Sequence, residues 1–129
     1  MIREIMDKIL QISQIPEIRR YTLVEDYLKS SFPSLSLIFL EDKKEAFTLN
    51  DLLHRIKFSI IIADKGKEGE VRKSVQDLAD IIESRVKNNP TLDGLVMNSF
   101  VVGRKVDSIQ EKDYSLGVVR LELEVVKVE

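Results

Sequence analysis

The chain contains no cysteine and no tryptophan, and it has only one histidine among its 129 residues. A disulfide scaffold and thiolate metal sites are therefore excluded. The lone histidine, His54, has no second histidine and no cysteine to join it as a ligand, so the sequence supports neither a zinc site nor a Ser-His-Asp site. We expect a structural or surface role for His54. We also expect no catalytic residues, no metal and no cofactor, which predicts a protein that is not an enzyme.

Long apolar runs and an excess of one charge are also absent. No apolar stretch approaches the roughly 18 to 20 residues that are needed to span a bilayer. The first ten residues include Arg3, Glu4, Asp7 and Lys8, which do not fit the apolar core of a signal peptide. The 20 basic and 22 acidic residues give a formal net charge of −2, which argues against a dedicated nucleic-acid binder. We expect a soluble protein without membrane contact that begins in a cytoplasm.

What the sequence does contain is periodic hydrophobicity on a highly charged background. Hydrophobic residues make up 43% of the chain and charged residues 33%, and the length suits one domain over residues 1–129. The clearest unit begins with a strand over Arg55–Ala63, in which Ile56, Phe58, Ile60 and Ile62 form an apolar face. A helix from Glu70 to about Lys87 follows. Its apolar positions recur at spacings of three and four: Val71, Val75, Leu78, Ile82 and Val86.

Between this strand and helix, Gly66 and Gly69 weakly resemble a phosphate-binding loop. The GxxxxGK[ST] and GxGxxG patterns are both missing. Glu68 and Glu70 also place negative charge where a phosphate would have to sit, and they favour the helix dipole instead. The segment therefore predicts a helix start rather than a nucleotide site.

The remaining elements are predicted from the same kinds of pattern. An amphipathic stripe indicates a first helix over Ile2–Ser13, and Pro16 ends it. Residues 1–31 as a whole are interpreted as a helical N-terminal arm, in which residues 17–31 fit either a short helix or an irregular segment. Alternation indicates three further strands, at Leu35–Leu40, Leu95–Val106 and Leu116–Val128.

Two connecting segments and two irregularities complete the pattern. Glu41–Asn50 is interpreted as a long hairpin loop, either solvated or docking on a neighbouring subunit, and Asp107–Ser115 as a polar link. Gly103 predicts a bulge in its strand. After Val125 the apolar phase changes, since Val126 and Val128 fall on the formerly charged side, which indicates a bulge or a sheet-edge contact.

The predicted order of elements is αββαββ. Two hairpins joined by a crossover helix give an α+β fold with a single four-stranded mixed sheet and helices packed on one face. One face of this sheet carries Arg55 and Lys57 on one strand and Arg120, Glu122 and Glu124 on another. Opposite charges paired across strands would add about 0.2 to 1 kcal/mol per pair. This face is either solvated, an inter-subunit surface, or the wall of a channel.

A family resemblance adds to this interpretation. An amphipathic opening helix precedes Phe32-Pro33, which stands just before the strand that begins Leu35-Ser36-Leu37-Ile38. A charged hairpin loop, the strand Ile56–Ile60 and the single long helix from Glu70 come next. The step Leu92-Asp93-Gly94-Leu95-Val96 then enters another strand, and a C-terminal strand runs to the last residue. In this order, and in length, the chain resembles the tail terminator (tail-completion) proteins of tailed bacteriophages and of prophage-derived tail particles.

The resemblance implies a structural protein of a phage or phage-like tail. Such proteins assemble as a ring, usually a hexamer, that caps the tail tube, ends its polymerisation and provides the head or neck attachment surface. The implied partners are other copies of the chain, the tail tube protein, the sheath where one exists, and the head-tail connector, while DNA passes through the lumen without specific binding. The implied location is the host cytoplasm during assembly and then the virion or tail-like particle.

Eight residues are our candidates for subunit or tube contacts, from the charged loop and the charged sheet face: Lys43, Lys44, Leu49, Arg55, Lys57, Arg120, Glu122 and Glu124. Two alternatives stay open. One is a head-closure or other neck protein, and the other is a small ligand-binding regulatory domain that pairs as a dimer.

Overall fold

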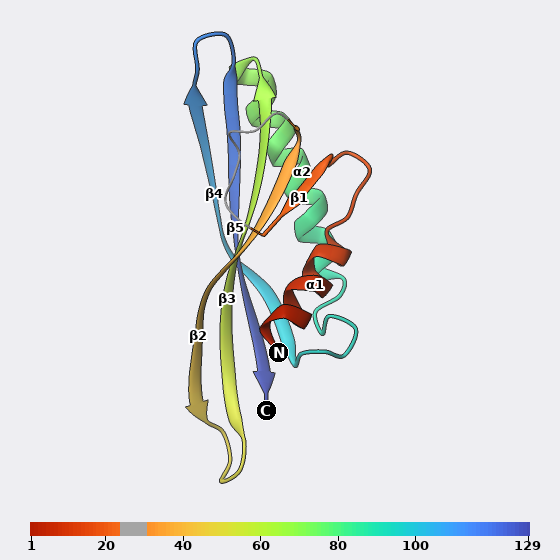
Figure 1. Cartoon of the computed structure of the whole chain (residues 1–129), viewed down its shortest axis with the longest axis vertical. Coiled ribbons are helices and arrows are strands. Elements are labelled where there is room, and N and C mark those ends of the chain that lie inside the picture. The colour runs from red at the N-terminus through yellow and green to blue at the C-terminus, as the bar shows by residue number, and fades with distance from the viewer. Residues whose placement is uncertain (24–30) are drawn as a thin grey trace.

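The computed structural model describes residues 1–23 and 31–129. Within them the fold is α+β, as predicted, with a single mixed sheet and two helices (Figure 1). The elements in chain order are α1 (Ile2–Ile12), β1 (Arg20–Thr22), β2 (Ser34–Ala46), β3 (Leu52–Gly66), α2 (Glu68–Lys87), β4 (Asn98–Gln110) and β5 (Ser115–Val128).

The described sheet has five strands rather than the predicted four, in the order β1-β2-β3-β5-β4. The additional strand, β1, pairs parallel with the start of β2, and the other neighbouring strands pair antiparallel. The predicted order αββαββ is therefore wrong by this strand, because three residues are too few for alternation to show. Tyr21 anchors β1, since its hydroxyl oxygen accepts a 2.8 Å hydrogen bond from the Ile15 amide. The part of the predicted arm at residues 24–30 lies outside the described residues.

The main core lies between the sheet and the two helices. The four apolar residues predicted for β3 are all buried there, and so are four of the five apolar positions predicted for α2; the fifth, Val71, is buried outside this cluster. Glu68 and Glu70 in the first turn of α2, and Arg85 and Lys87 in its last turn, complement the helix dipole. We call this side of the sheet the helix face and the other side the opposite face. The helix face also buries residues of α1, β2 and β5: Ile5, Ile9, Leu35, Leu37, Val119, Leu121, Leu123 and Val125.

The charged segment after the first predicted strand is itself strand, which corrects the prediction of a loop over Glu41–Asn50. β2 continues through Ala46, and Glu41 and Lys43 lie opposite Lys57 and Arg55 of β3. This part of the β2–β3 hairpin extends beyond both helices (Figure 1). Its side chains are mostly exposed, so charged residues are tolerated and the apolar alternation that marks a strand is missing.

The boundaries of the C-terminal hairpin also differ from the prediction. β4 begins at Asn98 instead of Leu95 and runs to Gln110, so only residues 111–114 separate it from β5. β5 keeps one register with β3 from Ser115 to Val128, so the predicted bulge after Val125 is absent. Val126 and Val128 simply face the opposite side of the sheet.

β2 and β4 each contain a bulge, and the two bulges lie at the same level of the sheet. Phe39, Phe58, Leu123 and Val101 lie side by side across β2, β3, β5 and β4, and we call them the waist row. On β2 the register shifts between Phe39 and Glu41; on β4 it shifts between Val101 and Gly103, which confirms the predicted bulge. Bulges increase local twist, and Figure 1 shows the strands crossing one another near mid-height.

A second, smaller cluster lies on the opposite face beyond the waist row. Ile61, Ala63, Leu116 and Val118 are buried there, with Phe32 and Ile38 packed against them. The sheet is thus buried on both faces at these residues, although Arg120 lies beside Ile61 on the same half. Arg55, Lys57 and Glu124 lie on the other half. Neither described helix is long and apolar enough to cross a bilayer.

Candidate assembly surface

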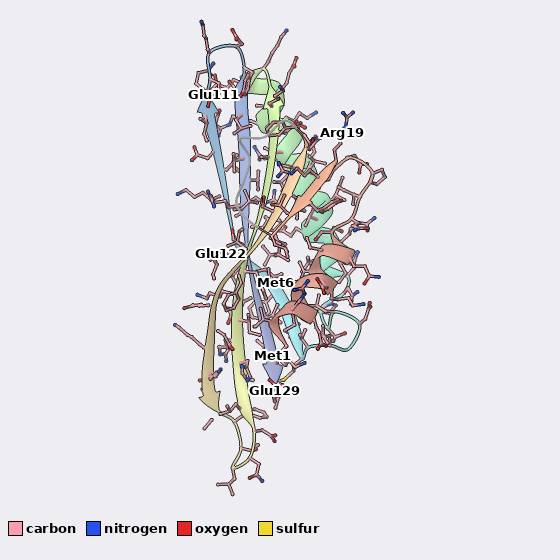
Figure 2. The ribbon with its side chains drawn as sticks, viewed as in Figure 1. Met1, Met6, Arg19, Glu111, Glu122 and Glu129 are labelled. Carbon is pink, nitrogen blue, oxygen red and sulfur yellow. The ribbon has the colours of Figure 1, made fainter. Side chains whose placement is uncertain are left out.

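Most of the charged candidates share one surface of the sheet. Strand alternation and register place Lys43, Arg55, Lys57, Arg120, Glu122 and Glu124 on the opposite face. Glu122 lies at mid-height, next to the waist row (Figure 2). The structure therefore brings together the charges that the sequence placed on one face of two strands, and it adds Lys43 of β2.

Arg55, Lys57 and Glu124 are paired within the chain. Arg55 lies 3.2 Å from Glu45 and 3.6 Å from Glu124, and Lys57 lies 3.5 Å from Glu41. The expected pairing of opposite charges across strands is thus present. The pairs are largely exposed, so each contributes at most about 1 kcal/mol. Their alternating sign leaves a surface without a basic track, which is the feature that would hold a nucleic acid tightly.

Lys44 and Leu49 lie elsewhere, so the eight candidates do not form a single site. Lys44 is opposite His54 in the β2–β3 register and faces the other side of the sheet. Leu49 belongs to the turn between β2 and β3, far from Arg120 and Glu122 at mid-height. The predictions for Leu49 and for the charged face therefore concern two separate surfaces.

The turn at the end of the β2–β3 hairpin forms the first of these surfaces, and we call Phe47, Leu49 and Leu52 the hairpin tip. Their exposed fractions are 53%, 102% and 44%. The turn is held by hydrogen bonds: the amides of Phe47 and Thr48 donate to the Asp51 carbonyl, and the amides of Asn50 and Asp51 donate to the Thr48 hydroxyl. The turn and the first residue of β3 thus carry three exposed apolar side chains, at the end of a hairpin that extends beyond the helices (Figure 1).

The opposite face is hollowed at mid-height. A cavity of about 370 Å³ lies across the sheet between the two bulges, and Leu40 and Gly103 belong to its lining. The remaining lining residues are Ile38, Ser59, Ile61, Lys105, Arg120 and Glu122. Apolar side chains of β2 and β3 thus meet charged side chains of β4 and β5 at this point.

His54 has a structural role, as expected from its lack of partners for chemistry. It is 4% exposed, its Nδ1 atom lies 3.1 Å from the Asp42 carboxylate, and its Nε2 atom lies 3.6 Å from Oε2 of Glu129. Glu129 is also bound through its backbone, because it exchanges hydrogen bonds with Leu52. Among the described residues, no three His, Cys, Asp or Glu side chains are placed to hold a metal ion.

Exposed apolar side chains at the two sides of the sheet were missed as candidates. Phe39 and Leu40 on β2 are 41% and 47% exposed, and Phe100 and Val102 on β4 are 38% and 46% exposed. Gly103 was a usable signal for the β4 group, since it marked the bulge. Leu40 carried no such signal, because it simply continues an apolar run. Comparison of the sequence with protein-family models and with curated proteins finds no match.

Proposed function

We propose that this chain is a structural subunit of a phage or phage-like tail. In this proposal it forms a ring on the end of the tail tube, ends tube polymerisation and presents the surface to which the head or neck attaches. Its partners are further copies of itself, the tail tube protein and the head-tail connector. It assembles in the host cytoplasm and remains in the finished particle.

The hairpin tip is the observation that carries this proposal. Leu49 is fully exposed, and it shares one ordered turn with two further apolar side chains. A projecting apolar group of this kind is typical of a protein contact site, since exposure of such side chains to water is unfavourable. A terminator has to bind the last ring of the tube, and a projecting hairpin whose turn is held by hydrogen bonds can reach that ring.

The charge distribution agrees with a conduit for DNA. The net charge is −2, and Arg55 and Lys57 on the opposite face pair with carboxylates of the same chain. These two cations are therefore less available for phosphate contacts. Because each such contact strengthens binding, this arrangement favours passage over retention.

The hairpin tip is tested by Leu49→Lys. An interface anchor contributes about 2 kcal/mol or more, so the charged substitution should weaken binding to tail tubes at least roughly 30-fold. Binding is measured by co-sedimentation with tubes assembled from a phage tail tube protein, and tube lengths are measured by electron microscopy. The variant should also let tubes grow past the length at which the unchanged chain stops them.

Ile81→Lys is the matched control. Ile81 is 39% exposed on α2, so the control adds the same charge at an exposed apolar position away from the hairpin tip. Its tube binding should stay unchanged. If the unchanged chain neither binds the tubes nor limits their growth, the proposed function is wrong; a dimer that binds a small metabolite instead would favour the regulatory-domain alternative.

A further inference from the structure

The two edges of the sheet differ in how much strand backbone they leave unpaired. β4 forms one edge over its whole length, Asn98–Gln110. On the other side, β1 pairs only with Ser34–Ser36, so the described strands leave the outer side of β2 unpaired from Ile38 to Ala46. Unpaired strand edges bind further strands readily, because their backbone amides and carbonyls lack partners.

These two edges carry apolar side chains at the same height. Leu40 lies in the β2 bulge and Val102 in the β4 bulge, and both bulges adjoin the waist row. Phe39 and Phe100 flank them, and all four side chains are more than one third exposed. Charged residues and proline usually keep a strand edge free. β2 carries charged residues from Glu41 to Glu45 and β4 carries Arg104 and Lys105, but the two bulged positions, Leu40 and Val102, are apolar and neither strand contains proline.

The strand directions at the two edges fit each other. β2, β3, β5 and β4 alternate in direction across the sheet, because each neighbouring pair is antiparallel. β4 therefore runs opposite to β2. A second copy placed beside the first in the same orientation brings β2 against β4 as an antiparallel pair, and the alternation continues from one copy to the next.

We infer that the β4 edge of one subunit pairs with the β2 edge of the next, with the two bulges at the centre of the contact. The occupant of each edge is a second copy of this chain, because the two edges match in direction, in height and in apolar character. This contact joins two different surfaces and is repeated by every copy, so it closes into a ring when the rotation allows it. The inference rests on the proposed ring and names the surfaces that build it.

Absence of native cysteine makes a direct test possible. Leu40→Cys and Val102→Cys are prepared as separate proteins, and both replace exposed side chains. A short bismaleimide cross-linker should give a covalent dimer when the two proteins are mixed and none with either protein alone. The double variant Leu40→Cys/Val102→Cys should give a ladder of covalent oligomers. Lys112→Cys, in the exposed turn before β5, is the control and should give no dimer.

The alternative outcomes separate the edge contact from the ring itself. Cross-linking of Val102→Cys alone would indicate a two-fold β4–β4 contact and would overturn the inference. A ring seen by analytical ultracentrifugation, without cross-linking in the mixture, would keep the proposed function and reject these edges. If every variant and the unchanged chain stay monomeric, both alone and with added tail tubes, the ring and the edge contact are both wrong. Thermal unfolding of each variant checks that the fold is intact.

Discussion

At the scale of single residues, the only histidine links β3 to its two neighbouring strands, β2 and β5, near the end of the β2–β3 hairpin. His54 of β3 contacts Asp42 of β2 through Nδ1 and approaches Glu129, which follows β5. Burial of a polar ring is unfavourable unless its nitrogen atoms find partners. The Asp42 carboxylate supplies a partner for Nδ1 and the Glu129 carboxylate lies near Nε2, so Glu129 is tied to the β2–β3 hairpin close to its tip. Figure 2 shows Met1 toward this same end of the molecule.

A double-mutant cycle on His54 and Asp42 measures this interaction. Asp42→Ala should lower the free energy of unfolding by about 1 to 3 kcal/mol, because it leaves a buried imidazole without its partner. The coupling energy with His54→Ala should lie at about 0.5 kcal/mol or more. Urea unfolding of the four proteins gives both values.

The exposed pair Arg55–Glu45, which joins β3 to β2 like His54–Asp42, is the control for that cycle. Its coupling energy should be about 0.2 to 1 kcal/mol. A coupling near zero for His54 and Asp42 would show that the pair contributes nothing specific, and the structural role of His54 would then lie in packing alone.

At the scale of elements, the first turns of α2 pack closely against β5 at Gly117. A Cβ atom at Gly117 would lie 3.0 Å from the Val71 carbonyl oxygen and 3.2 Å from its Cγ2 atom. The absence of a side chain at this position therefore lets the first turns of α2 reach the sheet. Val71 itself is buried at 2% exposure, so this contact belongs to the edge of the main core.

Gly117→Ala should for this reason destabilise the protein. The added methyl group meets backbone that cannot move without lifting α2, and overpacking of this kind costs about 1 to 3 kcal/mol. The midpoint of urea unfolding, with an unchanged slope, gives the loss. A stability equal to that of the unchanged chain would contradict the close approach.

Gly69→Ala provides the matched control within the same helix. A Cβ atom there meets nothing within 4 Å, so the substitution gains about 0.5 to 1 kcal/mol from the better helix propensity of alanine. The two glycine variants should thus change stability in opposite directions.

The elements show how far the sequence could predict the fold. Ile56, Phe58, Ile60 and Ile62 alternate without interruption, so the helix face of β3 was predictable, and the spacing from Val71 to Val86 predicted the buried stripe of α2. β1 was missed because Arg20, Tyr21 and Thr22 are too few to show a period. The second half of β2 was missed because its alternating charges resemble those of a solvated loop.

The candidate surface was predictable only in part, for a related reason. Alternation placed Arg55, Lys57 and Glu124 on one face, and the structure pairs Arg55 with Glu124 and Lys57 with Glu41. The exposed positions of Phe39, Leu40 and Phe100 depend instead on which strands lie at the edges of the sheet and where a bulge shifts the register. Those properties arise from tertiary pairing, and a period of two in the sequence is the same for edge and central strands.

At the scale of the whole molecule, three features fit a subunit of a larger assembly. The hairpin tip projects beyond the helices, the two edges match in direction and height, and the charged part of the opposite face is balanced in sign. A monomer that worked alone would leave these apolar groups in water. In a ring that sits on a tube, neighbouring subunits would cover the β2 and β4 edges, and the tube would cover the hairpin tip. The balanced charges of the opposite face would stay outside both contacts.

The mass of the particle in solution, measured by native mass spectrometry together with electron microscopy of its outline, tests this account most directly. The account predicts a closed ring, because a contact between two different surfaces repeats around one axis; the resemblance to tail terminators implies about six subunits. The ring should form with the unchanged chain alone or on the ends of added tail tubes. A particle that stays a monomer or a two-fold dimer under both conditions would contradict it.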